Sequence, residues 1–246
     1  MTVHIVVPAR LASTRLPNKP LADIGGKAMI VRVLEQCQKG GYEDVIAAVD
    51  DEHVYKVVVD AGFGAELTRT DHQSGSDRVM EVVSKRGWGD DDIVVNVQGD
   101  EPLIPHNLVN RLVEAMDASV ELATVSEPIT DIEDFENPNI VKVVTSRKGD
   151  ALYFSRAPIP HNRDETSVAD RLRHARRHVG IYAFKVHALR SFTEMRDVVL
   201  ETTEQLEQLR WLEYGRSIRV VHSEQAVPGG VDTPEDLARV RSILGG

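Results

Sequence analysis

The sequence predicts an α/β protein: a Rossmann-like, mostly parallel central sheet with helices on both faces, followed by a smaller antiparallel part. Two observations predict this architecture. Short apolar runs alternate with helical patterns over about the first 125 residues, as they do in βαβ units. Past Glu127-Pro128, two neighbouring apolar runs are joined by Arg147-Lys148-Gly149-Asp150, a turn sequence that is typical of an antiparallel hairpin.

The first predicted strand is the apolar run from Val3 to Val7, which fits a strand that is buried on both faces in the middle of a parallel sheet. Ligands bind at the carboxyl ends of such strands. The segment from Pro8 to Pro20 therefore predicts a polyphosphate site, because it offers small residues, hydroxyls and cations to an anion. These are Ala9, Arg10, Ser13, Thr14, Arg15 and Lys19. The alternative is a solvated surface loop, and neither the G-x-G-x-x-G pattern nor a P-loop is present.

The other elements follow from periodicity and turn residues. In the first half we expect a helix from Met29 to Cys37 closed by Gly40-Gly41, strands at 45–49, 65–68 and 93–97, and helices at 54–61 and from about Ser76-Asp77. In the second half we expect strands at 140–145, 151–155, 178–184 and 218–222, and a last helix after Asp232-Thr233-Pro234.

Two segments of the second half give more specific expectations. Leu206, Leu209 and Leu212 predict the apolar stripe of one helix that starts near Thr202-Thr203, with Gln205 in the capping-box position. Residues 161–175 have little apolar periodicity and predict an exposed, mobile loop.

Composition narrows the class of protein. The 246 residues are 41% hydrophobic, which is ordinary for a globular protein, and 29 Lys and Arg stand against 39 Asp and Glu. The net charge of −10 argues against general binding of nucleic acid or of an anionic membrane. A single cysteine, Cys37, excludes an internal disulfide and a cysteine-based metal site. No signal peptide and no membrane-spanning apolar run is visible, so the cytoplasm is the expected location.

Three further sites are candidates for ligand binding. The polar stretch from Thr68 to Arg78 precedes a helix, whose free amides could bind an anion or a base; alternatively, Ser76 or Asp77 only caps that helix. Asp100 follows the strongest predicted strand and could hold Mg²⁺, or could be a solvated turn residue. Asp232 is a second acidic candidate, for which helix capping is the simpler interpretation by spacing alone.

A fourth group is scattered along the second half: Tyr153 to Arg156, Arg177 to Tyr182, and Glu204 to Leu209. Nothing local shows that these segments converge. Taken singly, Arg156 is an ordinary surface cation, His178 a half-buried strand residue, and Glu207 or Gln208 part of a solvated helix face.

The chain as a whole resembles the 3-deoxy-manno-octulosonate (Kdo) cytidylyltransferases, the CMP-Kdo synthetases of lipopolysaccharide assembly. The opening motif indicates only the wider sugar nucleotidyltransferase superfamily. The assignment to this family rests on the Gln98 and Tyr153 motifs together with the Glu207-Gln208 helix. Residues between Pro160 and Arg176 are the least typical. The resemblance rests on Val6 to Arg10, Ser13 to Pro17, Lys19-Pro20, Asp71 to Gly75 with Asp77-Arg78, Val95 to Pro102, Ala151 to Arg156, His178 to Tyr182, Leu206 to Arg210 with Glu213 to Gly215, and Val231 to Asp236.

The resemblance implies the transfer of a cytidylyl group from CTP to Kdo, with Mg²⁺, in a homodimer. It implies one nucleotidyltransferase domain: residues 1–127 and about 216–246 bind nucleotide, and residues 128–215 form a sugar-binding and dimerisation part. Arg10, Lys19, Asp100 and Asp232 would be catalytic, with Asp100 and Asp232 as the magnesium ligands. The nucleotide would contact Ala9, Arg10, Ser13, Arg15, Lys19, Asp71, Ser74, Gly75 and Arg78, and the sugar Gln98, Arg156, His178, Tyr182, Glu207 and Gln208.

Two alternatives remain at this stage. A CMP-sialic acid synthetase would share the opening loop but should lack the Tyr153 to Arg156 and Glu207-Gln208 motifs. A regulatory protein could bind a nucleotide without turnover, although retention of both Asp100 and Asp232 argues against that, since binding alone needs no pair of metal ligands.

Overall fold

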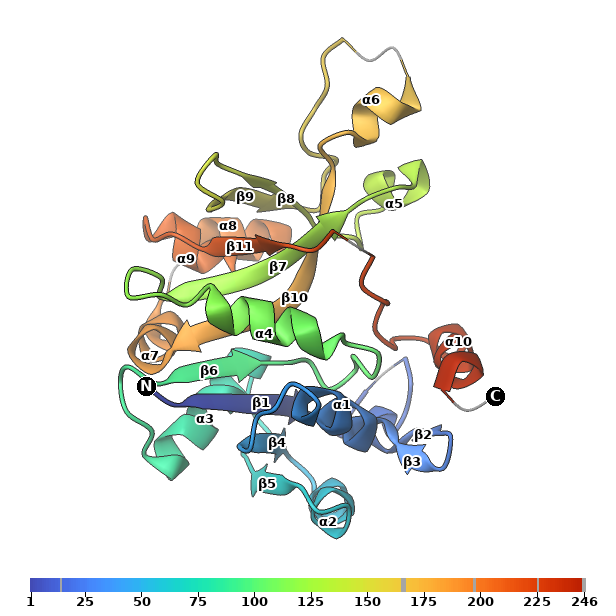
Figure 1. The fold of residues 1–246 in the computed structure, drawn as a ribbon, viewed down its shortest axis with the longest axis vertical. Coiled ribbons are helices and arrows are strands. Elements are labelled where there is room, and N and C mark those ends of the chain that lie inside the picture. The colour runs from blue at the N-terminus through green and yellow to red at the C-terminus, as the bar shows by residue number, and fades with distance from the viewer. Residues whose placement is uncertain (14, 165–166, 197, 225, 245–246) are drawn as a thin grey trace.

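The computed structural model describes residues 1–13, 15–164, 167–196, 198–224 and 226–244. Its centre is a sheet in which seven strands follow the order β11-β7-β10-β6-β1-β4-β5 (Figure 1). The first strand, β1 (Val3–Ala9), pairs in parallel with β4 (Val45–Val49) on one side and β6 (Ile93–Asn96) on the other. The prediction of a buried central strand is confirmed.

One strand of this path runs against the others. β10 (Arg176–Lys185) is antiparallel to β6 and to β7 (Leu122–Pro128), whereas β11 (Arg219–His222) is parallel to β7, and β5 (Gly64–Leu67) is parallel to β4. The sheet is therefore mostly parallel, as predicted.

The predicted hairpin is also confirmed. β8 (Lys142–Thr145) and β9 (Ala151–Ser155) pair in an antiparallel manner, and β8 joins the main sheet through β10. Gly149, in the turn between them, has a φ of 84°, a conformation that costs glycine little.

Helices cover both faces of the sheet, because successive residues of a strand point to opposite sides. Ile5 and Val7 of β1 pack in one core with the helices α1 (Met29–Gln38), α2 (Glu52–Asp60) and α4 (His106–Glu114). Val6 packs in a second core with helices on the other face. The helices of the second face are α3 (Gly75–Arg86), α7 (Val186–Glu194) and α9 (Leu209–Glu213).

The predicted continuous helix over Leu206 to Leu212 is wrong. α8 (Val199–Glu204) is followed by Gln205, whose φ of 52° lies in the left-handed region, and α9 starts only at Leu209. Leu206 and Leu209 are nevertheless buried. The leucine spacing thus marked core positions correctly, but Leu206 lies in the turn between two short helices and Leu209 begins the second one.

The segment 161–175 is not a plain loop either. It contains α6 (Val168–Leu172), whose amino end is capped by the Ser167 side chain accepting from the Asp170 amide. Residues 165–166 lie outside the described residues. α6 packs against α5 (Ile132–Glu136) in a small separate apolar cluster with Ile129, Phe135 and Ala175.

The carboxyl-terminal helix folds back on the beginning of the chain. α10 (Pro234–Leu244) lies beside the small hairpin of β2 (Asp23–Ile24) and β3 (Lys27–Ala28), which follows the short helix η1 (Lys19–Leu21) (Figure 1). Ile24 packs against Leu237 and Val240 of α10. This contact brings Asp232 next to Lys19. Within the described residues, no helix has the length and apolarity needed to cross a membrane.

Candidate active site

A polar cleft of about 330 Å³ lies at the carboxyl edge of the parallel strands. Loops after β1 and β6, the amino end of α3 and the residue Asp232 form its walls. Of the predicted site residues, the cleft gathers Ala9, Arg10, Ser13, Arg15, Lys19, Ser74, Gly75, Arg78, Gln98, Asp100 and Asp232. It is also lined by His72 and Gln73, which belong to the predicted Thr68 to Arg78 stretch but were not singled out as site residues. Thr14 lies outside the described residues.

Lys19 lies between the two predicted metal ligands. Its Nζ donates to Asp100 Oδ2 at 2.6 Å and to Asp232 Oδ1 at 2.8 Å, and Arg15 Nη2 lies 3.2 Å from Asp232 Oδ2. Burial favours the neutral amine, but the two carboxylates outweigh it and raise the pKa of Lys19. The centre of the cleft is thus a cation shared by two carboxylates that are 132 residues apart in the chain.

By spacing alone, helix capping was the simpler interpretation of Asp232, but another residue caps the helix. Thr233 caps α10: its Oγ1 accepts from the Asp236 amide at 3.2 Å, while the Asp236 carboxylate accepts from the Asp232 and Thr233 amides at 3.1 Å each. The Asp232 carboxylate is therefore directed to Lys19 and Arg15, where it is available to a ligand.

Close backbone packing fixes the acidic segments against β1. A Cβ added to Gly99 would lie 2.8 Å from the carbonyl oxygen of Pro8, so only glycine lets Asp100 lie across the end of β1. A Cβ added to Gly230 would lie 2.9 Å from Glu101 Oε1. The Val231 amide donates to the Asp100 carbonyl at 2.8 Å, which ties the two acidic segments to each other.

The two carboxylates fit a divalent cation that takes some of its ligands from the protein and the others from a substrate. Two carboxylates converge on one ammonium, whereas the described residues contain no cluster of three or more His, Cys, Asp or Glu that could enclose a metal. Mg²⁺ commonly takes one or two protein carboxylates and completes its shell with phosphate oxygens and water. The neighbouring Glu101 does not add a ready anion, because burial, and secondarily Asp100, raises its pKa to about 8.

The amino end of α3 forms the wall opposite the acidic residues. Ser74 caps this helix by accepting from the Asp77 amide at 3.1 Å, so the alternative that Ser76 or Asp77 is the cap does not hold. A Cβ on Gly75 would lie 3.5 Å from Pro8 Cγ, which shows how closely this helix end approaches β1. The first turn of a helix offers free amides to an anion or a polar base edge.

Arg78 lines the cleft but its charge is already paired. The side chain is buried, with Nη2 3.1 Å from Asp50 Oδ2 and Nη1 donating to Thr68 Oγ1 at 2.5 Å. Asp50 also accepts from the Leu11 amide at 2.9 Å and so connects three loops of the cleft. Sequence reasoning missed Asp50, although it directly follows β4 at the same edge as Asp100. Asp71 does not line the cleft; it is exposed and pairs with Arg69.

Four of the predicted sugar residues form a polar cluster at β10: His178 and Tyr182 belong to this strand, and Glu207 and Gln208 lie beside Tyr182. His178 Nε2 lies 2.9 Å from Thr124 Oγ1, and burial, with Arg177 adding to the effect, lowers the pKa of His178 to about 3. Tyr182 donates to Gln208 Oε1 at 3.2 Å. Burial also raises the pKa of Glu207, although a hydrogen bond with Ser76 opposes the shift.

This cluster adjoins the cleft and keeps two polar atoms without a partner among the described residues, Glu207 Oε1 and Gln208 Nε2. Gln98 connects the two regions, because it lines the cleft and donates to the Gly180 carbonyl at 3.3 Å. Ser76, two residues into α3, contacts Glu207. Unpaired buried polar groups are costly and are typical of a site that a ligand completes.

Arg156 is not brought to this cluster. Its guanidinium donates to the carbonyls of Glu204 at 2.7 Å, Pro138 at 2.9 Å and Gln205 at 3.3 Å, and it lies outside the cleft. In this conformation Arg156 holds the left-handed turn at Gln205. The buried Lys142 fixes Arg156 in turn, because Lys142 Nζ donates to the Arg156 carbonyl at 2.6 Å.

Comparison with known proteins agrees with this geometry. The cytidylyltransferase family model matches residues 4–218. A 3-deoxy-manno-octulosonate cytidylyltransferase of Alcanivorax borkumensis is 46% identical over 253 residues, which cover all of both chains. The structure of a CMP:2-keto-3-deoxy-manno-octonic acid synthetase complexed with CTP superposes with a TM-score of 0.90 at 40% identity, covering 99% of this chain and 98% of the other.

A more distant likeness concerns the fold alone. A cytidylyltransferase from Leptospira borgpetersenii has a TM-score of 0.64 at 17% identity, covering 98% of this chain and 86% of the other. Identity over the full length, together with the cleft, therefore places the chain: it belongs to the 3-deoxy-manno-octulosonate cytidylyltransferase family of cytidylyltransferases.

Proposed function

We propose that this chain transfers the cytidylyl group of CTP to Kdo, giving CMP-Kdo and pyrophosphate with Mg²⁺, and so activates Kdo for lipopolysaccharide synthesis. The observation that carries the proposal is the Lys19 ammonium held between Asp100 and Asp232 in a cationic cleft. Support comes from the relatives, one named for this activity and one solved with CTP.

The nucleotide is expected in the cleft at the strand ends. Arg10 and Arg15 are exposed cations that can pair with the triphosphate, as Arg forks do with phosphate oxygens. Ala9 and Ser13 let the backbone approach the phosphates closely, while Ser74 and Gly75 place the amino end of α3 against the base. Arg78 supports this wall from behind through Asp50. Asp71 remains a predicted contact that would require this loop to move.

In the reaction, the anomeric hydroxyl oxygen of Kdo bonds to the α-phosphorus of CTP. The bond from the α-phosphorus to the bridging oxygen breaks on the opposite side, pyrophosphate leaves with that electron pair, and the hydroxyl proton is released. Lys19 and Arg10 stabilise the negative charge that gathers on the leaving phosphates. Positioning of the two substrates by the walls of the cleft contributes much of the rate.

Mg²⁺ held by Asp100 and Asp232 would neutralise phosphate charge and polarise the reacting oxygens. With a metal held there, Lys19 would release at least one of these carboxylates, and its ammonium could then contact the phosphates.

The sugar is expected at the polar cluster next to Gln98. His178 is neutral at physiological pH, since burial lowers its pKa to about 3, so it recognises Kdo through a hydrogen bond and not through charge. Tyr182, Glu207 and Gln208 offer further groups to the sugar hydroxyls. The carboxylate of Kdo needs a cation, and Arg156 can serve if its guanidinium leaves the backbone carbonyls that it now contacts.

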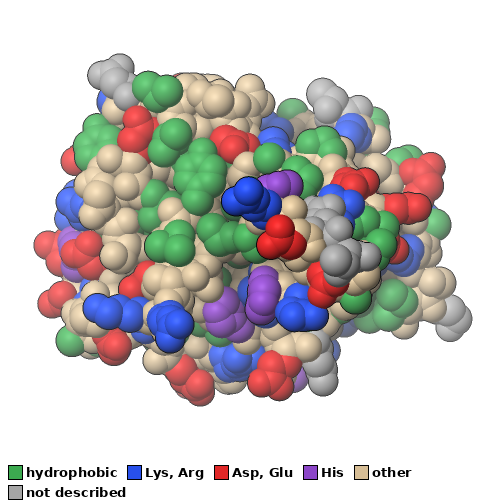
Figure 2. Space-filling model, turned by 90° about the horizontal axis from the view of Figure 1, so that it is seen from above, with side chains coloured by type: hydrophobic (Ala, Val, Ile, Leu, Met, Phe, Trp, Pro, Cys, Tyr) green, Lys and Arg blue, Asp and Glu red, His purple; other side chains and the backbone are tan. Residues whose placement is uncertain are grey.

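We further propose a homodimer formed through the part of the chain from residue 128 to 215, with residues 1–127 and about 216–246 as the nucleotide-binding part. Figure 2 shows hydrophobic side chains gathered on the face that carries β9 and α8. Leu152 of β9 and Val199 of α8 are 63% and 65% exposed there. Sedimentation velocity of the protein and of Leu152→Glu tests this: we expect a dimer that the substitution weakens.

Release of pyrophosphate tests the activity. We expect release only when CTP, Mg²⁺ and Kdo are all present, and we expect Kdo to be preferred over a panel of other acid sugars. Rapid release with sialic acid and none with Kdo would assign the chain to the sialic acid enzymes instead. Tight CTP binding without release with any sugar would favour a regulatory nucleotide-binding protein.

A further inference from the structure

The segment Val227–Val231 carries Asp232 to the cleft without regular structure of its own. It connects β11 to α10, and residues 226–232, all of them described, form no helix or strand. The position of Asp232 therefore depends on the side chains that hold this segment.

An ion pair with a buried carboxylate holds both backbone groups of Val227. The Glu127 carboxylate accepts from the Val227 amide, and Arg177 Nη2 donates to the Val227 carbonyl at 3.0 Å. Glu127 and Arg177 lie opposite each other on β7 and β10, and their side chains form an ion pair through Arg177 Nε. Glu127 is only 5% exposed, so water competes little for these bonds.

The same pair extends toward the acidic centre of the cleft. Arg177 Nη1 would lie 3.9 Å from a Cβ at Gly229, so its guanidinium packs along the segment. The two residues that follow Gly229 contact the segment after β6. Gly230 packs against Glu101, and the Val231 amide donates to the Asp100 carbonyl. Asp232 follows directly.

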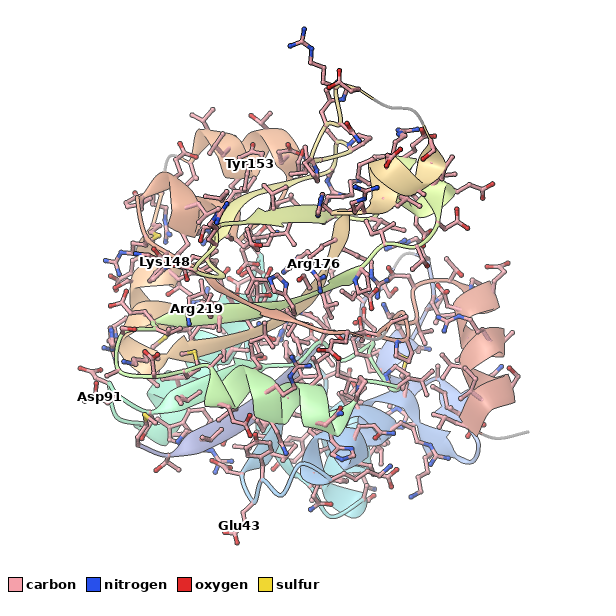
Figure 3. The ribbon with its side chains drawn as sticks, turned by 45° about the horizontal axis from the view of Figure 1, so that its top comes forward. Glu43, Asp91, Lys148, Tyr153, Arg176 and Arg219 are labelled. Atoms are coloured by element: carbon pink, nitrogen blue, oxygen red, sulfur yellow. The ribbon has the colours of Figure 1, made fainter. Side chains whose placement is uncertain are left out.

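The neighbouring Arg176 makes different contacts and does not hold the segment that bears Asp232. Arg176 also lies on β10 and its Nη2 donates to the carbonyls of Ser126 at 3.2 Å and Ser223 at 2.9 Å, which ties β10 to β7 and the end of β11. In Figure 3 it lies among the strands in the middle of the view. Arg176 thus supports the sheet, whereas Arg177 reaches beyond the sheet to the chain that bears Asp232.

We propose that Arg177, fixed by Glu127, is a positioning residue that sets where Asp232 lies relative to Asp100. Its effect on turnover rests on the proposed function, and its effect on the segment does not. Groups that orient metal ligands without touching the metal typically alter metal affinity by about 10- to 100-fold when they are removed.

The test compares Arg177→Gln with the matched control Arg176→Gln, using two measurements. In the substrate-free protein, we expect hydrogen exchange at the Val227 and Val231 amides to accelerate about tenfold or more in Arg177→Gln only. In pyrophosphate release, we expect Arg177→Gln to need about tenfold more Mg²⁺ for half-maximal rate and to lower kcat, with the KM for CTP nearly unchanged. Arg176→Gln should leave the exchange at these amides and the Mg²⁺ dependence unchanged.

If Arg177→Gln fails to fold, the double variant Glu127→Gln/Arg177→Gln replaces it, because it leaves no unpaired carboxylate buried. We expect it to show the same faster exchange and the same higher Mg²⁺ requirement. Unchanged exchange and Mg²⁺ dependence in a folded variant that lacks Arg177, or equal changes in Arg176→Gln, would overturn the proposal. If the unaltered protein releases no pyrophosphate with Kdo, the proposed function fails, and the exchange comparison still decides the role of Arg177.

Discussion

The cleft and the polar cluster at β10 differ in the charge and pairing of their polar groups. In the cleft, Arg10 and Arg15 are exposed, and two carboxylates share one ammonium. In the cluster, His178 is held neutral by burial, and the Tyr182 hydroxyl is bonded to Gln208. Under the proposed function, we expect the cleft to recognise charge and the cluster to recognise hydroxyl groups, where a missing hydroxyl on the ligand would be penalised strongly.

The largest effect is expected at the acidic centre of the cleft. Asp100→Asn should lower the rate of pyrophosphate release by about 10²- to 10³-fold, because it removes an anion from the reaction centre, while CTP binding changes only a few-fold. Steady-state kinetics and calorimetric titration of CTP measure the two effects. The control is Glu43→Gln, whose side chain lies at the edge of the molecule in Figure 3. A normal rate in Asp100→Asn would remove Asp100 from the metal site.

Next in size is the loss of the ion pair behind the cleft. Asp50→Asn leaves the guanidinium of Arg78 buried without a charged partner, and breaking such a pair costs about 3–5 kcal/mol of the free energy of unfolding. The exposed pair of Arg69 and Asp71 offers a matched control, since Asp71→Asn removes the same kind of contact in water. Urea denaturation should show a large loss for Asp50→Asn and none for Asp71→Asn. Equal effects would mean that burial of the Arg78 pair does not matter.

Close packing at the end of β1 gives a smaller, steric effect. Gly99→Ala places a methyl group 2.8 Å from the Pro8 carbonyl, and the backbone shift should cost about 1–3 kcal/mol of stability and lower turnover. Gly64→Ala on the edge strand β5 is the control, because a Cβ there makes only ordinary van der Waals contacts, the nearest at 3.4 Å. Thermal unfolding and kinetics of both variants decide the point. A neutral Gly99→Ala would show that the loop can move away from β1 without loss.

The neutral state of His178 predicts a pH dependence. The folded-state pKa of His178, about 3, is below its unfolded value of 6.5, so between these values the unfolded chain binds a proton that the folded protein does not. Stability is therefore lost as pH falls below about 6.5, with a slope from this group of about 1.4 kcal/mol per pH unit. In His178→Gln that part of the slope should vanish between pH 6 and about 4. An identical slope in both proteins would mean that His178 takes up protons freely when folded.

The same contrast explains how much of the site could be predicted. Ala9, Asp100 and Ser74 each adjoin a strand or helix end, and parallel strands bring such ends to one edge, so local patterns located most of the cleft. His178 and Glu207 come together only through packing of β10, α3 and α9, and the resemblance alone selected them. Their convergence depends on contacts between distant segments that no local pattern encodes.

The errors have local physical causes. Gln205 takes a left-handed φ that is uncommon for a residue other than glycine, so nothing in the leucine spacing indicated the break between α8 and α9. Thr233 and Asp232 are both good caps, and the return bond from Asp236 selects Thr233. Asp50 was missed because its role becomes visible only with its partner Arg78, on a helix that starts 25 residues later.

The most direct test of the central claim is a crystal structure with CTP and Mn²⁺, an ion that can be located by its anomalous scattering. We predict that the triphosphate lies along Arg10 and Arg15, with Mn²⁺ bound by Asp100 and Asp232 and with the Lys19 ammonium on a phosphate oxygen. Nucleotide bound elsewhere, or Mn²⁺ in contact with neither carboxylate, would contradict the assignment of this cleft as the cytidylyl transfer site.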